Sequence, residues 1–356
     1  MKVVVDGNIF SSNMNGIPRY AYEILKRLDK TRFDDIVFEL VSYNDMRSNI
    51  PHFSNIRTVV LPKRKFWHYR VLLPYLKAHN AVYLNFSNYG MKYCNSIYVF
   101  HDAIPLEINN DLPMIREIKN KFLFWICLNL AFFFGKNFIT VSNEALKSIS
   151  NWCVLSRGKE ISIIGNGWEH IDEIQNDDSV FGEFGNIRKG EYFLVLGNVL
   201  PHKNLRWIID NAILYKDVHY VVVGNIFSHF GIDMVRKLEK CENIIFVGYQ
   251  SDERVKALMM GAKALVSPSL LEGFGIPPLE ALACGTKVIV SDIPVHREIY
   301  GDAVAYLDPR NPGLDLNSVD WNKDRGVEVK RVLETYTWEN ATKKWEHLIR
   351  KIRQGL

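Results

Sequence analysis

The chain has 356 residues, of which 47% are hydrophobic and 24% are charged, and its formal net charge at pH 7 is +4. This length exceeds what one hydrophobic core usually serves, and the composition is that of a globular protein, so we expect two domains. The small positive charge does not by itself indicate a nucleic-acid-binding protein, and no nucleic acid partner is expected.

The start of the chain and its cysteines bear on location. The opening MKVVVDGNIF has neither the apolar core nor the small-residue cleavage site of a signal peptide. The five cysteines, at positions 94, 127, 153, 241 and 284, form no CxxC pair. Such spacing is typical of reduced thiols rather than of disulfides or zinc ligands, so a cytoplasmic location is expected.

Short β-branched runs alternate with helical patterns in the first half of the chain. Strands are expected at 2–7, 35–43, 56–61, 81–86, 96–102 and 137–142, and a helix at 17–28. This alternation predicts a doubly wound parallel sheet. A polar run at 172–190 then interrupts the pattern and is typical of a linker between domains.

The same alternation restarts after the polar run. Strands are expected at 192–198, 218–225, 243–248, 264–269 and 286–292, and helices at 204–214, 251–262 and 277–285. We therefore expect two α/β domains of similar size, 1–170 and 171–335, each with an open parallel sheet. The remaining residues, 336–356, are predicted to form an amphipathic helix. Its apolar face would consist of Trp338, Ala341, Trp345 and Leu348.

One segment, FLFWICLNLAFFF at 122–134, is almost wholly apolar. As a helix it would span roughly 20 Å, short of the ~30 Å hydrocarbon core of a bilayer, so we do not expect it to cross one. One interpretation is a buried helix packed on a sheet. The other is a helix that lies in a membrane interface, apolar face down, between flanking lysines.

A basic and aromatic stretch, PKRKFWHYR at 62–70, could join such a membrane contact. Its cations Lys63, Arg64, Lys65 and Arg70 would meet anionic headgroups, while Phe66, Trp67 and Tyr69 would lie at the interface. Taken alone, such a stretch is more often a solvated loop.

The stretch LLEGFGIPPLEALACGT at 270–286 carries the strongest indication of a ligand site. Gly273 and Gly275 let backbone amides approach a ligand, and a helix opened by Pro277 or Pro278 presents unpaired N–H groups that suit a diphosphate. Glu272 stands at the loop entrance, and Glu280 is expected in the first turn of that helix. Each carboxylate could accept hydrogen bonds from a pair of sugar hydroxyls. Taken singly, each glutamate is better explained as a capping or solvated acid.

The segment EGFGIPPLE resembles the E-x7-E signature of the retaining glycosyltransferases of family 4, and the resemblance extends over 267–309. That family has the GT-B fold, in which two Rossmann-like domains place their parallel sheets on either side of a central cleft. The resemblance implies that Glu272 contacts the transferred sugar and Glu280 the ribose. The backbone of Gly273, Phe274, Gly275 and Ile276 would face the donor diphosphate.

Blocks in the first half agree with the resemblance in the same order. NMNGIPRYAYEIL is similar to the family's glycine-rich loop, where Gly16 would approach the diphosphate and Asn15 replaces a frequent second glycine. VFHDAIPL resembles the block that borders the transferred sugar, which places His101 and Asp102 on the acceptor side. Without the resemblance, a lone histidine at a strand end is more often structural. In VSNEALKSI, Ser142 would cap a helix.

Blocks in the second half would hold the nucleotide. LGNVLPHKNL resembles the block that supplies two basic groups to the diphosphate: Lys203 matches the lysine, but Asn198 replaces a common arginine. His202 or Arg206 could compensate. In VGYQSDERVKALM, the backbone at 249–251, which begins with Tyr249, would frame the base. The final helix, 336–356, resembles the one that returns to the first domain.

No metal or other cofactor is expected, because Lys203 and the loop amides would neutralise the leaving diphosphate. The acidic run NDD at 176–178 lies in the expected linker and is interpreted as solvated. A two-step retaining mechanism needs a carboxylate near the anomeric carbon, and the sequence offers no clear candidate. The resemblance instead implies front-face departure, in which the leaving phosphate takes the acceptor's proton.

The function implied is transfer of a hexose or deoxyhexose from a nucleotide diphosphate sugar to a glycan hydroxyl. GDP-mannose or dTDP-rhamnose is favoured, and a UDP-sugar remains open. The expected setting is O-antigen, capsule or exopolysaccharide synthesis on a lipid-linked acceptor at the inner face of the cell membrane. The alternatives are a catalytically weak scaffold subunit that binds sugar nucleotides, and another GT-B enzyme such as an epimerase or phosphorylase.

Overall fold

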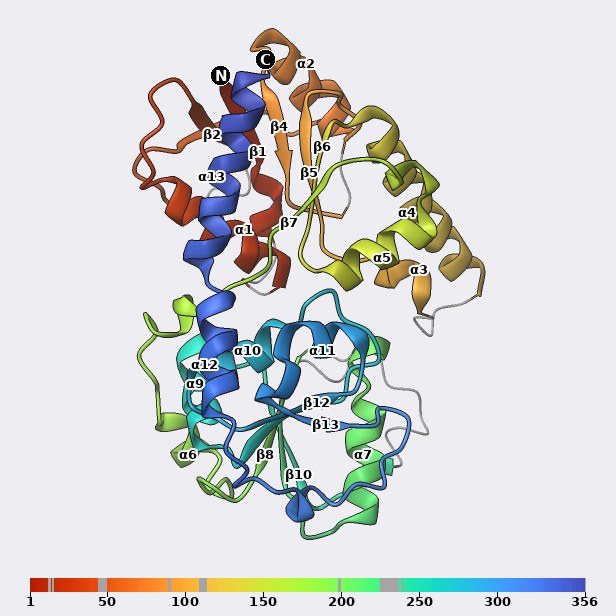
Figure 1. Cartoon of the computed structure of the whole chain (residues 1–356), viewed down its shortest axis with the longest axis vertical. Coiled ribbons are helices and arrows are strands. Elements are labelled where there is room, and N and C mark those ends of the chain that lie inside the picture. The colour runs from red at the N-terminus through yellow and green to blue at the C-terminus, as the bar shows by residue number, and fades with distance from the viewer. Residues whose placement is uncertain are drawn as a thin grey trace. The chain divides into compact units, whose positions relative to one another are not determined.

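The computed structural model describes residues 1–11, 14, 16–43, 50–88, 91–108, 114–197, 200–224, 237–238 and 240–355. The chain divides into two compact units (Figure 1). The first consists of Met1–Leu106, Ile118–Asn166 and Trp338–Leu356, and the second of Glu107–Glu117 and Gly167–Thr337.

The first unit is built on a seven-stranded parallel sheet with the order β3-β2-β1-β4-β5-β6-β7. Its strands are β1 (Lys2–Asp6), β2 (Val37–Tyr43), β3 (Arg57–Leu61), β4 (Val82–Asn85), β5 (Ser96–Phe100), β6 (Asn137–Thr140) and β7 (Ile161–Ile163). Val3, Val4 and Val5 of β1 are fully buried, as expected of a parallel strand with both faces covered. All the strands predicted in this half are confirmed. β7 was not predicted, because three residues are too few to show a period.

Helices cover this sheet (Figure 1). They are α1 (Gly16–Leu28), α2 (Leu73–Ala78), α3 (Ile104–Glu107), α4 (Met114–Phe134), α5 (Asn143–Trp152) and α13 (Trp338–Gln354), with shorter helical turns at Gly7–Ser11, His68–Leu72 and Val154–Ser156. The predicted cap of α5 is confirmed, since Ser142 Oγ accepts a 2.9 Å hydrogen bond from the backbone N–H of Ala145.

The last helix, α13, packs on α1 inside the first unit. Trp345 is fully buried, and its indole N–H donates a 3.0 Å hydrogen bond to the hydroxyl of Tyr20. The Tyr20 hydroxyl in turn donates to the carbonyl of Ile164. Trp338 packs edge-on against the same Tyr20 ring at 5.8 Å. The carboxyl end of the chain therefore supplies core residues to a sheet that begins with β1.

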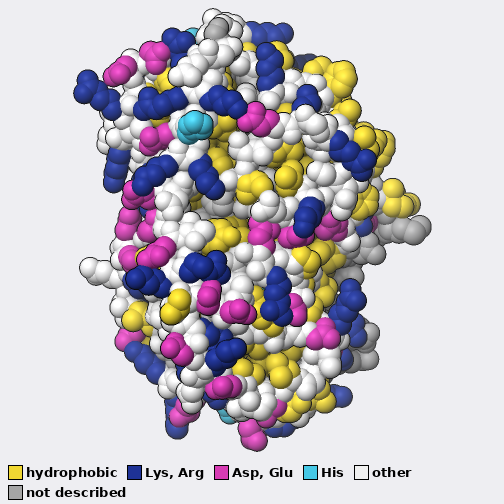
Figure 2. Space-filling view, viewed as in Figure 1, with side chains coloured by type: hydrophobic (Ala, Val, Ile, Leu, Met, Phe, Trp, Pro, Cys, Tyr) yellow, Lys and Arg dark blue, Asp and Glu magenta, His cyan; other side chains and the backbone are white. Residues whose placement is uncertain are grey.

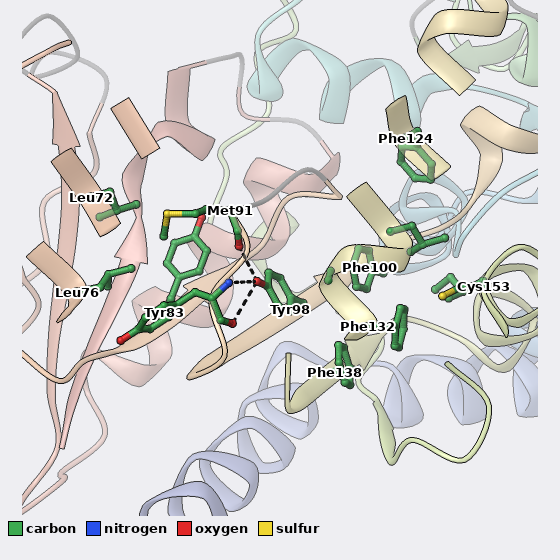
Figure 3. Close-up of a cluster of buried hydrophobic side chains, with 14 of the residues drawn as sticks. Leu72, Leu76, Tyr83, Met91, Tyr98, Phe100, Phe124, Phe132, Phe138 and Cys153 are labelled. Atoms are coloured by element: carbon green, nitrogen blue, oxygen red, sulfur yellow. Dashed lines mark hydrogen bonds between the residues drawn. The ribbon is translucent and has the colours of Figure 1, made fainter. Parts of the chain in front are cut away.

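The core on one face of the sheet joins α2 and α4 across β4 and β5 (Figure 3). Tyr98 of β5 lies at its centre, where its hydroxyl donates to the carbonyl of Met91 at 2.5 Å. Phe132 of α4 stacks on Phe138 at 4.3 Å, and Leu76 of α2 belongs to the same cluster. Both helices thus lie over one face of the sheet.

Helix α4 contains the apolar segment for which two interpretations were left open. Phe124, Leu128 and Phe132 are buried against the sheet. Phe122 and Phe133, by contrast, are 60% and 66% exposed. The buried-helix interpretation therefore accounts for one face of α4 only. No helix in the described part of the chain combines the length and the hydropathy needed to cross a bilayer.

The basic and aromatic stretch 62–70 is an exposed loop and turn as far as Phe66, as one interpretation expected, and is helical after it. It leads into a short π-helical turn, His68–Leu72. Phe66 and Tyr69 are exposed, but Trp67 is only 5% exposed and packs edge-on against Tyr43. The expectation that Trp67 would lie at an interface is therefore wrong, because its ring fills the core beneath α2.

The second unit has a six-stranded parallel sheet with the order β10-β9-β8-β11-β12-β13. Its strands are β8 (Phe193–Leu196), β9 (Tyr220–Val223), β10 (Ile244–Gly248), β11 (Ala264–Ser267), β12 (Val288–Ser291) and β13 (Ala305–Leu307). Its helices are α6 (Ser179–Glu183), α7 (Leu205–Leu214), α9 (Asp252–Gly261), α10 (Ile276–Ala283), α11 (Pro294–Tyr300) and α12 (Gly326–Thr335), with helical turns at Glu169–Ile171, Pro201–Lys203, Gly301–Ala303 and Leu316–Ser318. The predicted fold class, two Rossmann-like α/β domains with parallel sheets, is confirmed.

The polar run 172–190 lies inside the second unit, where it contains α6. Its acidic residues are partly exposed, as expected, but they are paired. Asp178 contacts Lys189 at 2.6 Å, and Asp177 contacts Arg254 of α9 at 3.3 Å. The run therefore packs against the surface of the second unit.

We expect Trp345→Ala to lower the free energy of unfolding by about 3–5 kcal/mol, because it empties a fully buried indole site and leaves the Tyr20 hydroxyl without its donor. Urea denaturation followed by circular dichroism measures the change. The matched control is Lys343→Ala on the exposed face of α13, with an expected change within about 0.5 kcal/mol. Equal effects of the two substitutions would contradict this account of α13.

Candidate functional site

The loop between β11 and α10 holds the first candidate residues. Gly275 precedes α10 with φ 92°, a backbone conformation that favours glycine. Pro277 lies in the first turn of the helix, and Gly285, with φ 74°, follows its end. The predicted opening and ending of this helix are confirmed. The loop therefore presents Gly273, Gly275 and Ile276 at a helix N-terminus.

Glu272 and Lys203 form an ion pair in the structure. The Lys203 ammonium lies 2.6 Å from Glu272 Oε1, and Ser269 Oγ donates to the same oxygen at 2.7 Å. The Glu272 side chain is 9% exposed and that of Lys203 is 27% exposed. Burial alone would raise the pKa of Glu272, but the charge and the hydrogen bond of Lys203, together with the nearby histidines, outweigh it and hold that pKa below the ordinary 4.5. Glu272 is therefore a buried, ionised acceptor.

Two neighbouring strands bring this pair together. Lys203 ends the helical turn after β8, and Glu272 follows β11, which pairs directly with β8. The backbone N–H of Leu270 donates to the carbonyl of His202 at 2.7 Å, and the Asn204 side-chain amide donates to the carbonyl of Pro268. The sheet order reverses between β8 and β11, which is where open α/β sheets bind ligands.

A small pocket opens at this point of the sheet. Its lining includes Gly197 and Lys203 after β8 and Ser267 and Ser269 after β11. The pocket is thus lined by the ammonium of Lys203, the hydroxyl of Ser269 and the backbone of Gly197. Such a set suits an anionic ligand with hydroxyl groups. Asn198, which was predicted to face the diphosphate together with Lys203 in place of a common arginine, lies outside the described residues.

Two histidines lie beside the ion pair and are held neutral. Burial, followed by the nearby Lys203 charge, lowers the pKa of His202 to about 4. His296 of α11 is fully buried, and burial lowers its pKa as well. Its Nδ1 lies 2.9 Å from the carbonyl of Ser291, so this nitrogen carries the proton. The Nε2 atom has no hydrogen-bond partner among the described residues.

Helix α11 supports the turn at Gly275 from behind. The Tyr300 hydroxyl donates a hydrogen bond to the carbonyl of Gly275. A methyl group added at Gly275 would meet His296 Nε2 at 3.4 Å. Phe274 is buried against Tyr336, so this residue offers the site only its backbone. His296 and Tyr300 were not predicted, although PVHREIY at 294–300 lies within the stretch 267–309 that carries the resemblance.

Glu280 is placed differently from the prediction. It lies in the second turn of α10, not the first, because the helix begins at Ile276. Its Oε1 is 2.7 Å from Nε2 of His170, a buried residue of the turn Glu169–Ile171. One oxygen of Glu280 is thus already bonded. His170 gave no signal in the sequence, since 110 residues separate it from Glu280.

The remaining predicted residue of this unit, Tyr249, follows β10 and is 67% exposed. Ser251, two residues later, is the N-cap of α9. Tyr249 thus stands at the carboxyl edge of the sheet that also carries Lys203 and Glu272, two strands from β8. Its expected contact with a base stays a prediction.

The predicted residues of the first unit are held by local contacts. His101 is 7% exposed, and burial lowers its pKa to about 4. Its Nε2 lies 3.1 Å from the carbonyl of Phe86, so this nitrogen donates. Asp102 accepts a hydrogen bond from the backbone N–H of Ile104. Gly16 has φ 47°, and a methyl group there would meet nothing within 4 Å, so its backbone is open to approach.

A second buried carboxylate lies at the corresponding point of the first sheet and was not predicted. Asp6 ends β1, at the strand-order reversal between β1 and β4. Its Oδ2 lies 2.8 Å from His68 Nε2 and accepts a 3.0 Å hydrogen bond from the Tyr83 hydroxyl. Burial would lower the pKa of His68, but the bond to Asp6 raises it. The simplest account of this group is a satisfied polar network of the core.

Comparison with known proteins bears on this geometry. Residues 178–313 match the family model described as "Glycosyl transferases group 1". The chain is 28% identical over 298 residues to the O-antigen chain mannosyltransferase RfbU of Salmonella typhimurium, a match that covers 80% of this chain and 77% of that protein. These matches support a glycosyltransferase. The matched region includes Lys203, Glu272 and Glu280.

Solved structures confirm the fold. The sucrose-phosphate synthase of Thermosynechococcus elongatus superposes with a TM-score of 0.74 at 13% identity, over 100% of this chain and 99% of that one. Anabaena HepE in complex with UDP and glucose gives a TM-score of 0.70 at 14% identity, over 99% of this chain and 100% of that one. At such identities the likeness shows the fold, which is GT-B.

We expect Lys203→Met to lower the free energy of unfolding at pH 7 by about 1–3 kcal/mol, because it leaves the buried Glu272 carboxylate without its cation. The pKa of Glu272 is lower in the folded chain than in the unfolded one, so the pair stabilises the fold above about pH 4.5. That contribution is lost as the pH falls through the folded-state value. The deficit of the variant should therefore shrink in acid.

The matched control is the double variant Lys203→Met with Glu272→Gln, which removes the orphaned charge. It should unfold at a higher urea concentration than Lys203→Met alone at pH 7. Additive losses in the double variant would mean that the two side chains do not interact.

Proposed function

We propose that the chain is a retaining glycosyltransferase that moves a hexose or deoxyhexose from a nucleotide diphosphate sugar to a glycan hydroxyl. One observation carries the proposal: the Lys203–Glu272 pair lies at the strand-order reversal of the second sheet, beside the glycine loop before α10. The match of residues 178–313 to the glycosyl transferases group 1 model includes all of these elements.

The proposed donor site uses both partners of this pair. The ammonium of Lys203 neutralises the diphosphate as the glycosidic bond breaks, together with the amides of 273–276 and the positive end of α10. Glu272 accepts hydrogen bonds from hydroxyls of the transferred sugar, which replace the bond that Lys203 gives it in the structure. Glu280, oriented by His170, contacts the ribose, and the backbone at Tyr249 frames the base.

In this proposal the anomeric configuration is retained because the diphosphate leaves, and the acceptor attacks, on the same face of the sugar. The bond from the anomeric carbon to the phosphate oxygen breaks, and the acceptor oxygen forms its bond on the same side. The acceptor's proton passes to the leaving phosphate, so no protein base is required. His101, held neutral by burial, and Asp102 border the sugar on the acceptor side. The backbone of Gly16 approaches the diphosphate.

The proposed donor sugar and the proposed biosynthetic setting are inferred from similar proteins. RfbU of Salmonella typhimurium is named for O-antigen mannosyl transfer, which favours GDP-mannose here and a place in O-antigen synthesis. dTDP-rhamnose is the second choice, and the UDP bound to HepE keeps a UDP-sugar open. The acceptor is a lipid-linked glycan presented at the inner face of the cell membrane. No metal takes part, since Lys203 supplies the positive charge.

The test is release of free nucleoside diphosphate from a panel of nucleotide sugars, with and without EDTA. Glu272→Gln should lower turnover about 100-fold or more, because its contact with the sugar strengthens in the transition state. The control is Glu242→Gln, an exposed acid before β10 at the opposite edge of the sheet, with no expected loss. Full activity of Glu272→Gln would refute the sugar contact. Donor binding without turnover in the native chain would favour a scaffold subunit, and activity that EDTA abolishes would refute metal independence.

A second substitution tests the loop backbone. Gly275→Ala should raise the KM for the donor, because a φ of 92° is unfavourable for a residue with a side chain and the turn before α10 must rearrange. Gly285→Ala is the control: its φ is also positive, so both variants should lose roughly 1–2 kcal/mol of stability, but Gly285 follows the other end of α10. If both variants keep the native KM, the loop amides do not contact the donor.

A further inference from the structure

The outward face of α4 is an unusual surface for a folded domain. Its exposed apolar side chains include Ile118, Phe122, Leu123, Trp125, Phe133 and Phe134. The same helix buries its opposite face against the sheet. Among the outward side chains, that of Trp125 also contacts the unit, since its indole N–H donates a 3.1 Å hydrogen bond to the carbonyl of Trp152. Contiguous exposed apolar surface of this kind marks an interaction site.

The stretch before α2 lies over the same side of the sheet. Leu72 and Leu76 below it share one core cluster with Phe124 and Phe132 of α4 (Figure 3). The outward side chains of this stretch, Phe66 at 63% and Tyr69 at 48% exposure, therefore point away from the sheet on the side that α4 occupies.

The strip between the two segments is bridged by the loop before β5. Met91 and Tyr93, which flank Lys92, are buried in the same core cluster as Trp67 and Phe124. Lys92 itself is exposed. Phe66, the 92–94 loop and the outward face of α4 thus form one surface, which we call the aromatic face.

Charge is segregated onto this surface. The segments 62–77 and 114–136 contain nine lysines and arginines against a single acid, Glu117, whereas the whole chain has a net charge of only +4. The rest of the chain is therefore net negative. Lys65 and Arg70 lie over the Phe66 ring at 5.4 and 5.9 Å. Figure 2 shows apolar side chains along the edge of the molecule where Figure 1 places α4, with Lys and Arg side chains among them.

We infer that the aromatic face docks on an anionic phospholipid bilayer. Aromatic and aliphatic side chains rimmed by cations match the headgroup boundary, where rings are buried and Lys and Arg meet phosphate. A protein partner of matching chemistry would need an acidic rim, and a second copy of this chain would bring the same cations into contact with each other. The inference deepens the proposed function and rests on it for its purpose, which is to bring the first unit to a lipid-linked acceptor.

The test is flotation of the full chain with vesicles of phosphatidylcholine, with or without 30% phosphatidylglycerol, at about 0.1 M salt. We expect binding to the anionic vesicles that weakens as salt is raised. Changing Lys63, Arg64 and Lys65 together to alanine should lower partitioning about 100-fold, at roughly fivefold for each cation. The control changes Lys330, Lys343 and Lys351 to alanine and should keep the native partitioning.

The apolar part of the face is tested with Phe122→Ser and Phe133→Ser combined. Both side chains are exposed, so the fold should be kept while partitioning falls about tenfold. The control combines Met260→Ser and Val327→Ser, two exposed apolar residues of the second unit. Absence of flotation, or flotation unchanged by both sets of substitutions, would overturn the inference. Self-association lost in the Phe122 and Phe133 variant would assign the face to a second copy and overturn it as well.

Nucleoside diphosphate release in detergent-free solution separates the two proposals. A chain that floats but never consumes a donor would refute the proposed transferase and support the membrane surface. A chain that consumes a donor but never floats would refute the membrane surface and support the proposed transferase.

Discussion

Parallel strands that are neighbours in a sheet deliver the loops after them to the same edge. In the second unit this constraint acts on β8 and β11, because the strand order reverses between them and their loops lead to opposite sides. Lys203 and Glu272 are 69 residues apart in the chain, and only this pairing brings them within 2.6 Å. The glycine loop, the N-terminus of α10 and the pocket beside Ser269 all depend on the same edge.

A buried carboxylate needs a partner, and the identity of the partner decides what the site can do. Lys203 and Ser269 both donate hydrogen bonds to Glu272. A sugar nucleotide offers a substitute for each, a diphosphate for the lysine and hydroxyls for the glutamate. A diphosphate that bound Lys203 would therefore free Glu272 to accept bonds from the sugar hydroxyls. Sugar hydroxyls bound to Glu272 would likewise free Lys203 for the diphosphate. The pKa of Glu272 is lowered while Lys203 lies beside it, so the carboxylate of the structure is ionised and can accept hydrogen bonds.

The sequence predicted the strands well and the contacts within the site poorly. Runs such as VVV and VIV are explained by a parallel sheet alone, so β1 and β12 could be predicted without knowing their neighbours. Glu272 and Lys203 were each predicted to face a ligand, but not each other. The bond between His170 and Glu280 could not be predicted either, because it depends on how a helical turn packs on α10. Trp67 was predicted at the surface but is buried, and Glu280 was predicted in the first turn of α10 but lies in the second.

Helix α13 belongs to the first unit, although the whole second unit precedes it in the chain. The ribosome therefore delivers the last helix of the first unit after the whole second unit. Until Trp338 and Trp345 emerge, Tyr20 and Phe86 lack the indoles that cover them, and the first unit is a partly open intermediate while the second can already fold. Trimming the carboxyl end, which many proteins tolerate, would here expose the core of the domain that was synthesised first.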